Sequence, residues 1–139
     1  MRIMGIDYGD ARTGIALSDL LCSIVGSTCV VPSRNKEKLM ADIVRIAKEN
    51  AVTTVVVGLP KNMDGSKGFR ADACEELGEL LKSFTEIPVT FWDERLTTVS
   101  AHRILSDNNV RGKKRKNVVD AVSADIILQD FIDFRKNKI

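Results

Sequence analysis

The chain has 139 residues, a formal net charge of +2, 44% hydrophobic residues and 29% charged residues. This length suits one compact domain, so we expect residues 1–139 to form a single domain, and the small net charge gives no ground for an anionic partner. No apolar run reaches membrane-spanning length, no signal peptide precedes the first apolar run, and the odd set Cys22, Cys29 and Cys74 lacks metal-type spacing. We therefore expect a cytoplasmic protein without a membrane partner, its cysteines buried in a reducing compartment.

The chain opens with two apolar runs joined by a polar turn. The first run ends in Asp7, and Gly9 and Gly14 frame the turn before Ile15 to Leu17. This pattern predicts two paired strands with a carboxylate at the end of the first. A turn in which Asp7 bonds only its own loop is an equally good reading of this stretch alone.

The remaining elements follow from changes in hydrophobic period. In chain order we expect a strand over 24–31, a helix carrying Leu39, Ile43, Ile46 and Ala47 with Asn35 or Ser33 as N-cap, a strand from Val52 to Leu59, a helix carrying Ala73, Leu77, Leu80, Leu81 and Phe84, a strand from Val89 to Trp92, and a helix from Thr97 or Thr98 to about Asp107. Three successive strands followed by alternating helices and strands predict an α/β fold. Its sheet would be mixed and five-stranded, with the first three strands antiparallel and helices on both faces.

The last helix carries an acid on its apolar stripe. We expect Asn117 to cap it, and Asp120 then shares a face with Ala124, Ile127 and Phe131. A capping-box role for Asp120 is the alternative, but an acid on a buried stripe is costly unless it meets a cation or a donor. Asp125 is predicted to be a solvated residue.

Two further acids stand near the carboxyl ends of strands, where ligands collect in such sheets. Asp7 ends the first strand, and Glu94 follows the strand that ends at Trp92, although Asp93 and Glu94 also suit a solvated pair before a helix. Three acids at one edge would repel each other unless cations lie between them. Hard oxygen ligands suit Mg²⁺ or Mn²⁺, and two such ions about 3.5–4 Å apart can activate water for phosphodiester cleavage. We therefore expect Asp7, Glu94 and Asp120 to be both catalytic and metal-binding.

A basic run precedes the last helix. Its cations are Arg111, Lys113, Lys114, Arg115 and Lys116. As a bare charge run it would be solvated and mobile, but beside an acidic metal site it suits contacts to a phosphate backbone. Lys61 and Asn62, after the strand that ends at Leu59, are expected to contact another phosphate.

Four stretches together resemble one protein family. They are 5-GIDYG-9 with 12-RTGIA-16, 57-VGLPKNMDG-65, 92-WDERLTT-98, and 119-VDA-121 with 127-ILQ-129. In this order they are similar to the YqgF family, whose fold is RNase H-like and resembles Holliday junction resolvases. The resemblance covers essentially the whole chain and implies a nuclease that matures the 5′ end of 16S ribosomal RNA, with Asp7, Glu94 and Asp120 as its acidic site. We also expect Arg12 and Arg95, within these stretches, to contact nucleic acid.

The alternatives concern substrate and activity. Related resolvases carry a fourth acid where this chain has Ser123, which weighs against efficient cleavage of branched DNA, although a junction resolvase would share the site. A non-catalytic ribosome-assembly factor is a second alternative, against which the retained acids argue. An actin-like ATP-binding fold would need two related domains. The expected partner is precursor ribosomal RNA or branched DNA, and the expected assembly is a monomer or a homodimer.

Overall fold

The computed structural model describes residues 1–60, 68–93 and 112–137, with the side chains of the last range described from Ser123 to Lys136. The elements in these ranges are β1 (Arg2–Tyr8), β2 (Arg12–Ser18), β3 (Val25–Pro32), α1 (Lys36–Glu49), β4 (Val52–Leu59), α2 (Phe69–Lys82), β5 (Val89–Asp93) and α4 (Gly112–Asn137). The helix expected from Thr97 or Thr98 lies outside the described residues. No described helix is both long enough and apolar enough to span a membrane.

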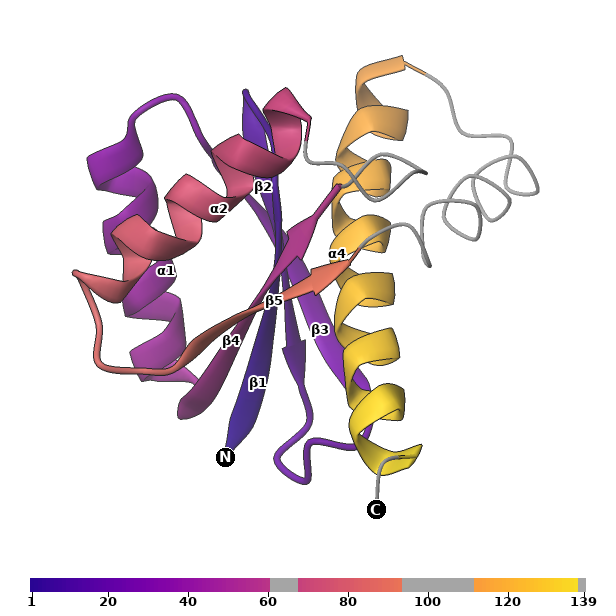
Figure 1. Ribbon diagram of the computed structural model, residues 1–139. Coiled ribbons are helices and arrows are strands. Elements are labelled where there is room, and N and C mark those ends of the chain that lie inside the picture. The colour runs from indigo at the N-terminus through magenta and orange to yellow at the C-terminus, as the bar shows by residue number, and fades with distance from the viewer. Residues whose placement is uncertain (61–67, 94–111, 138–139) are drawn as a thin grey trace.

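The five strands form one mixed sheet in the order β3-β2-β1-β4-β5. β2 pairs antiparallel with β1 and with β3, whereas β4 pairs parallel with β1 and with β5. Figure 1 shows α1 and α2 on one face of the sheet and α4 on the other. The predicted five-stranded mixed sheet with helices on both faces is confirmed.

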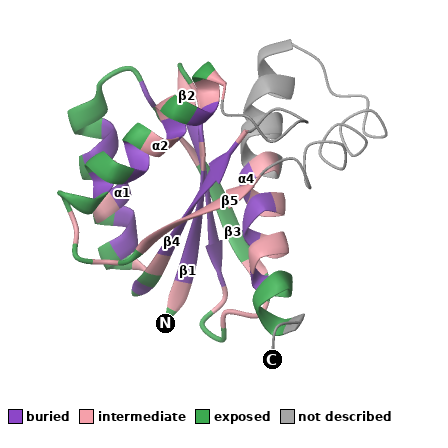
Figure 2. Cartoon of the chain, viewed as in Figure 1, coloured by how far each residue is buried: buried purple, intermediate pink, exposed green. Residues whose placement is uncertain are grey.

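Side chains alternate along β1 and so divide the core between the two faces. Met4, Ile6 and Tyr8 belong to the cluster that α1 and α2 cover, and Ile3 belongs to the cluster under α4. Figure 2 shows β1 and β4 largely buried between these layers and β3 largely exposed. Of the three cysteines predicted to be buried, only Cys74 is buried: Cys22 is half-buried, and Cys29 is exposed because β3 lies at the sheet edge.

Gly5 lets α4 lie directly against β1. A Cβ built on Gly5 would stand 2.8 Å from Cβ of Leu128 and 3.2 Å from the carbonyl oxygen of Ala124. Both distances are shorter than ordinary van der Waals contact, so a glycine is required for the helix to approach this closely. This contact fixes the height of α4 relative to the end of β1.

The expected caps and stripes of the first two helices are only partly right. Asn35 caps α1 through its Oδ1, which accepts from the Lys38 amide at 3.0 Å, as predicted. The predicted burial of Leu80 and Phe84 is wrong: Leu80, on α2, is 37% exposed, and Phe84, which lies beyond the end of α2 at Lys82, is 47% exposed. Gly78 is the reason: a Cβ there would overlap the Phe91 ring, so α2 turns its Gly78 side toward β5 and leaves Leu80 outside.

The last helix begins earlier than predicted. α4 starts at Gly112, so Asn117 is not its N-cap and 113–116 have helical backbone instead of forming a separate basic segment. Lysine and arginine are good helix formers, and each residue added to an existing helix gains a backbone hydrogen bond. The described part of the predicted stripe faces the sheet, since Ala124 and Ile127 are fully buried and Phe131 is half-buried against the same cluster.

Candidate active site

The candidate site lies at the sheet edge where the parallel strands end. β1, β4 and β5 run in the same direction and end at Tyr8, Leu59 and Asp93. α2 and α4 both begin at this edge, which is the upper one in Figure 1. Ligands of such sheets bind outside the carboxyl ends of parallel strands, so the carboxylates at this edge are the ones to consider.

Asp7 is the last residue but one of β1. It pairs with Gly14 of β2, and alternation along β1 puts it on the same face as Ile3 and Gly5, the face that α4 covers. Its side chain is half-buried. A carboxylate in this place is held by two strands and still reaches solvent.

α4 runs antiparallel to β1 and brings the position of Asp120 toward the same edge. Ile3 and Ile132 line one cavity at the far end, and Gly5 meets Ala124 and Leu128 in the middle. Two strand residues from Gly5 to Asp7 advance about 7 Å. Along α4, Asp120 precedes Ala124 by four residues and Leu128 by eight, which is about 6 and 12 Å in the same direction. The backbone of Asp120 therefore lies at the same edge as Asp7, at its height or somewhat beyond it.

The third predicted acid follows β5. Glu94 comes directly after Asp93 and lies outside the described residues. β5 itself is tied to α4, because the Trp92 ring packs edge-on against Phe131 and Phe134 with centroids 6.3 and 5.4 Å apart. The strand that leads to Glu94 is thus fixed relative to the helix that carries Asp120.

The predicted nucleic-acid contacts are described only in part. Lys61, Asn62, Arg95 and Arg111 lie outside the described residues, as do the side chains of 113–116. Arg12 is described: it opens β2 opposite Pro32 of β3, half-buried, five residues after Asp7.

The turn between β1 and β2 is tight and is held from α2. A Cβ on Gly9 would clash with the carbonyl oxygen of Arg12, so only glycine fits there. Arg70, in the first turn of α2, donates from one guanidinium nitrogen to the Tyr8 carbonyl and from the other to Oδ1 of Asp10 at 2.7 Å. The same guanidinium lies 5.7 Å from the centroid of the Tyr8 ring. Sequence reasoning missed Arg70, because no local pattern links it to a turn 60 residues away.

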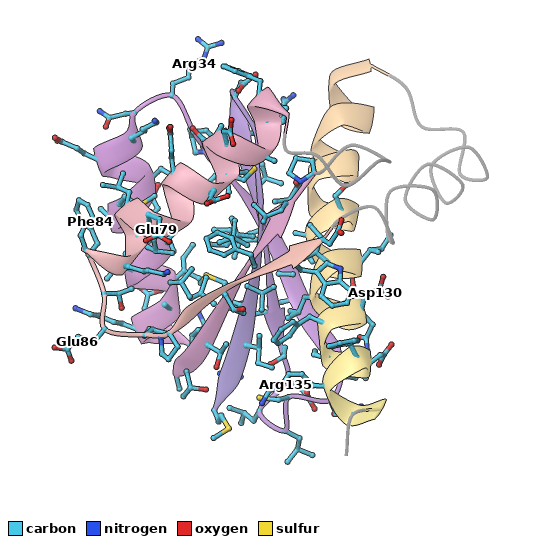
Figure 3. The ribbon with its side chains drawn as sticks, viewed as in Figure 1. Arg34, Glu79, Phe84, Glu86, Asp130 and Arg135 are labelled. Atoms are coloured by element: carbon cyan, nitrogen blue, oxygen red, sulfur yellow. The ribbon has the colours of Figure 1, made fainter. Side chains whose placement is uncertain are left out.

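Three further cations at this edge were also missed. The Ser33 amide donates to the Ala11 carbonyl at 3.0 Å, and the buried hydroxyls of Thr13 and Ser33 lie 2.5 Å apart. These bonds fix the start of α1 beside the β1–β2 turn. Three exposed cations lie at this start. The cations are Arg34, Lys36 and Lys38. Figure 3 shows Arg34 pointing away from the body at this edge. The signal in the sequence was three cations within five residues just before the Leu39 stripe.

Asp125 is not the solvated residue predicted from its helical face. It is half-buried, and burial raises the pKa of its carboxyl group. Burial, helped by the neighbouring Asp133, likewise raises the pKa of Asp130. Figure 3 shows Asp130 on the side of α4 that faces away from the sheet. Both carboxyl groups are thus partly desolvated, whereas the helical period indicated a solvated position for Asp125.

Comparison with known families decides where this chain belongs. The family model for RuvX, described as Holliday junction resolvase, matches residues 1–134. The chain belongs to the RuvX family. RuvX is the YqgF family that the sequence resembles, so that prediction is confirmed.

RuvX relatives match the chain over nearly its whole length. One from Halothermothrix orenii, named "Putative pre-16S rRNA nuclease", is 42% identical over 139 residues, covering 100% of this chain and 99% of the relative. One of the same name from Clostridioides difficile is 43% identical over 136 residues, covering 98% and 96%.

Solved structures confirm the RNase H-like, resolvase-like fold. RuvC of T. thermophilus in complex with a Holliday junction substrate has a TM-score of 0.61 at 13% identity, covering 99% of this chain and 96% of that one. The fowlpox virus Holliday junction resolvase has a TM-score of 0.60 at 13% identity, covering 96% and 99%. At such identities the likeness shows the fold alone.

Proposed function

We infer that this chain is a divalent-metal-dependent nuclease that hydrolyses RNA phosphodiester bonds, and that it acts at the 5′ end of precursor 16S ribosomal RNA. One observation carries this proposal. Asp7 lies at the carboxyl end of β1, on the face of the sheet that α4 covers, and the backbone of Asp120 on α4 lies toward the same end. The names of relatives 42% and 43% identical over almost the full chain support the substrate.

The donor chemistry at this edge fits Mg²⁺ or Mn²⁺. Asp7 offers carboxylate oxygens from a half-buried position on a strand held on both sides. No three metal-ligating side chains come together within the described part of the chain, which leaves out Glu94 and the side chain of Asp120. We propose that these three acids hold the ions, two in number. When bound, such ions lower the pKa of water and stabilise the leaving oxygen.

The other residues would bind and orient the substrate. Cations at the edge would neutralise phosphates on either side of the cleaved bond, with affinity that falls as salt rises. The proposed phosphate-binding residues are Arg12, Lys61, Asn62, Arg95, Arg111, Lys113, Lys114, Arg115 and Lys116. Because these contacts read the backbone, specificity would come from RNA shape and not from base sequence.

Branched DNA is the second candidate substrate. The family description names a Holliday junction resolvase, and the fold is shared with resolvases solved with junctions. Ser123 is half-buried on α4. The family resemblance implies an acid at this position in related resolvases, and its replacement by serine here favours RNA over junctions. A non-catalytic assembly factor would keep the fold without the chemistry. We further propose that the protein works in the cytoplasm as a monomer or a homodimer, without a membrane partner.

Cleavage assays separate these proposals. The wild type, Asp7→Asn and the control Asp133→Asn are each incubated with a precursor 16S RNA fragment or with a DNA four-way junction. Each reaction is run in Mg²⁺, in Ca²⁺ and in EDTA. Asp133 is a suitable control because it is exposed near the far end of α4. We expect Mg²⁺-dependent cleavage of RNA, absent in Ca²⁺, which coordinates more loosely, and in Asp7→Asn but kept in Asp133→Asn. Cleavage of the junction alone would favour the resolvase, and cleavage of neither substrate would favour the assembly factor. Full activity in EDTA would contradict the metal mechanism.

A further inference from the structure

Arg70 contacts the β1–β2 turn on both sides of Gly9. One nitrogen of its guanidinium binds the Tyr8 carbonyl, the other binds Asp10 at 2.7 Å, and the group stacks on the Tyr8 ring 5.7 Å from the centroid. Tyr8 is the residue that directly follows Asp7. A single side chain from α2 thus fixes the backbone next to the proposed metal ligand.

The geometry of these contacts requires an arginine. The guanidinium is planar and presents several N–H groups in a fixed fork, so it can serve a carbonyl and a carboxylate together. A lysine carries the same charge on a compact ammonium group and does not reproduce the fork or the stacking. The turn itself has no spare room, because a Cβ on Gly9 would clash with the Arg12 carbonyl. The backbone of this tight turn, bound by one rigid guanidinium group, therefore has one preferred conformation.

Surface stabilisation does not account for this arrangement. Asp10 is 87% exposed and Arg70 is 37% exposed, and an ion pair between exposed groups adds little to stability. Arg45 shows the contrast: its two ion pairs, with Asp42 and Glu49 at 3.5 Å, both stay within α1. What distinguishes Arg70 is the contact to the Tyr8 carbonyl.

We propose that Arg70 is a positioning residue for Asp7. It holds the β1–β2 turn so that the Asp7 carboxylate keeps one orientation toward the face that α4 covers. This rests on the proposed function, in which Asp7 is a metal ligand. A carboxylate that loses its orientation binds metal more weakly and orders the attacking water less well, so the loss appears in turnover and metal affinity and not in RNA affinity.

The test compares Arg70→Ala, Arg70→Lys and Arg45→Ala in the full chain, with Mn²⁺ binding measured by calorimetry without RNA and cleavage measured with Mg²⁺. We expect Arg70→Ala to lower kcat by about 10- to 100-fold with KM changed less than about 2-fold, and to weaken Mn²⁺ binding several-fold. Arg70→Lys should resemble Arg70→Ala, because charge without the fork is not enough. Arg45→Ala should match the wild type in both measurements.

The outcomes test the positioning role of Arg70 separately from the proposed nuclease activity. Wild-type Mn²⁺ affinity and kcat in Arg70→Ala would overturn the positioning role while leaving the nuclease intact. A raised KM with normal Mn²⁺ binding, restored by Arg70→Lys, would make Arg70 a phosphate contact instead and would also overturn it. If the wild type binds Mn²⁺ without cleaving, the Mn²⁺ affinities still decide on Arg70. A wild type that does neither overturns both proposals.

Discussion

Gly5→Ala is the substitution whose effect the structure defines most closely. The added Cβ would stand 2.8 Å from Cβ of Leu128, 3.2 Å from the Ala124 carbonyl oxygen and 3.4 Å from Cα of Leu128. None of these atoms is the far end of a flexible side chain, so α4 must shift away from β1. Inserting atoms into a packed core costs about 1–3 kcal/mol. At about 3–4 °C per kcal/mol for a chain of this size, we expect the melting temperature to fall by about 3–12 °C.

Gly26→Ala is the matched control. Gly26 lies in the exposed strand β3, and a Cβ there would meet its nearest atom, the Asp19 amide nitrogen, at 3.6 Å, an ordinary contact. We expect its stability to equal or slightly exceed that of the wild type, because alanine restricts the unfolded chain. Thermal denaturation of both variants gives the comparison. A Gly5→Ala midpoint equal to that of Gly26→Ala would refute the close packing of α4 on β1, and with it the height assigned to Asp120.

Two further predictions follow from charges. Replacing Arg34, Lys36 and Lys38 by alanine should weaken binding of single-stranded RNA about equally for different sequences. The slope of the logarithm of the binding constant against the logarithm of the salt concentration should fall by up to about 0.7 per lost contact. An unchanged slope would mean that these cations touch no phosphate. Burial raises the folded-state pKa of Asp125 above its unfolded value, so folding loses stability as pH rises through the interval between those two pKa values. Asp125→Asn should therefore raise the urea midpoint at pH 7 and leave it nearly unchanged at a pH below both pKa values; a lowered midpoint at pH 7 would contradict the burial.

The sheet and the main helices could be predicted because they depend on local patterns. The run Val52 to Leu59 is predominantly apolar, with Val55 to Leu59 buried, and β4 has those bounds in the structure. Asn35 offers an acceptor three residues before the amide of Lys38, which a cap requires. That residues 1–139 form a single domain remains a prediction.

Two of the errors arise where tertiary contacts override local pattern, and the third is a local error about where a helix begins. The stripe of α2 depends on Gly78 meeting Phe91, a contact that the helical period does not contain. The start of α4 was placed at a capping residue, although the basic residues before it are good helix formers. Arg70 acts through a turn far away in sequence, so only the fold reveals it.

The most direct test of the account is Mn²⁺ titration of four single variants against the wild type by calorimetry. Asp7→Asn, Glu94→Gln and Asp120→Asn each remove one charge with little change in volume, and Asp133→Asn does the same at an exposed position away from the site edge. If the three acids form one site, each of the first three variants should weaken Mn²⁺ binding at least about tenfold, and Asp133→Asn should bind as the wild type does. Wild-type Mn²⁺ affinity in any of the first three, in a folded protein, would contradict a shared metal site.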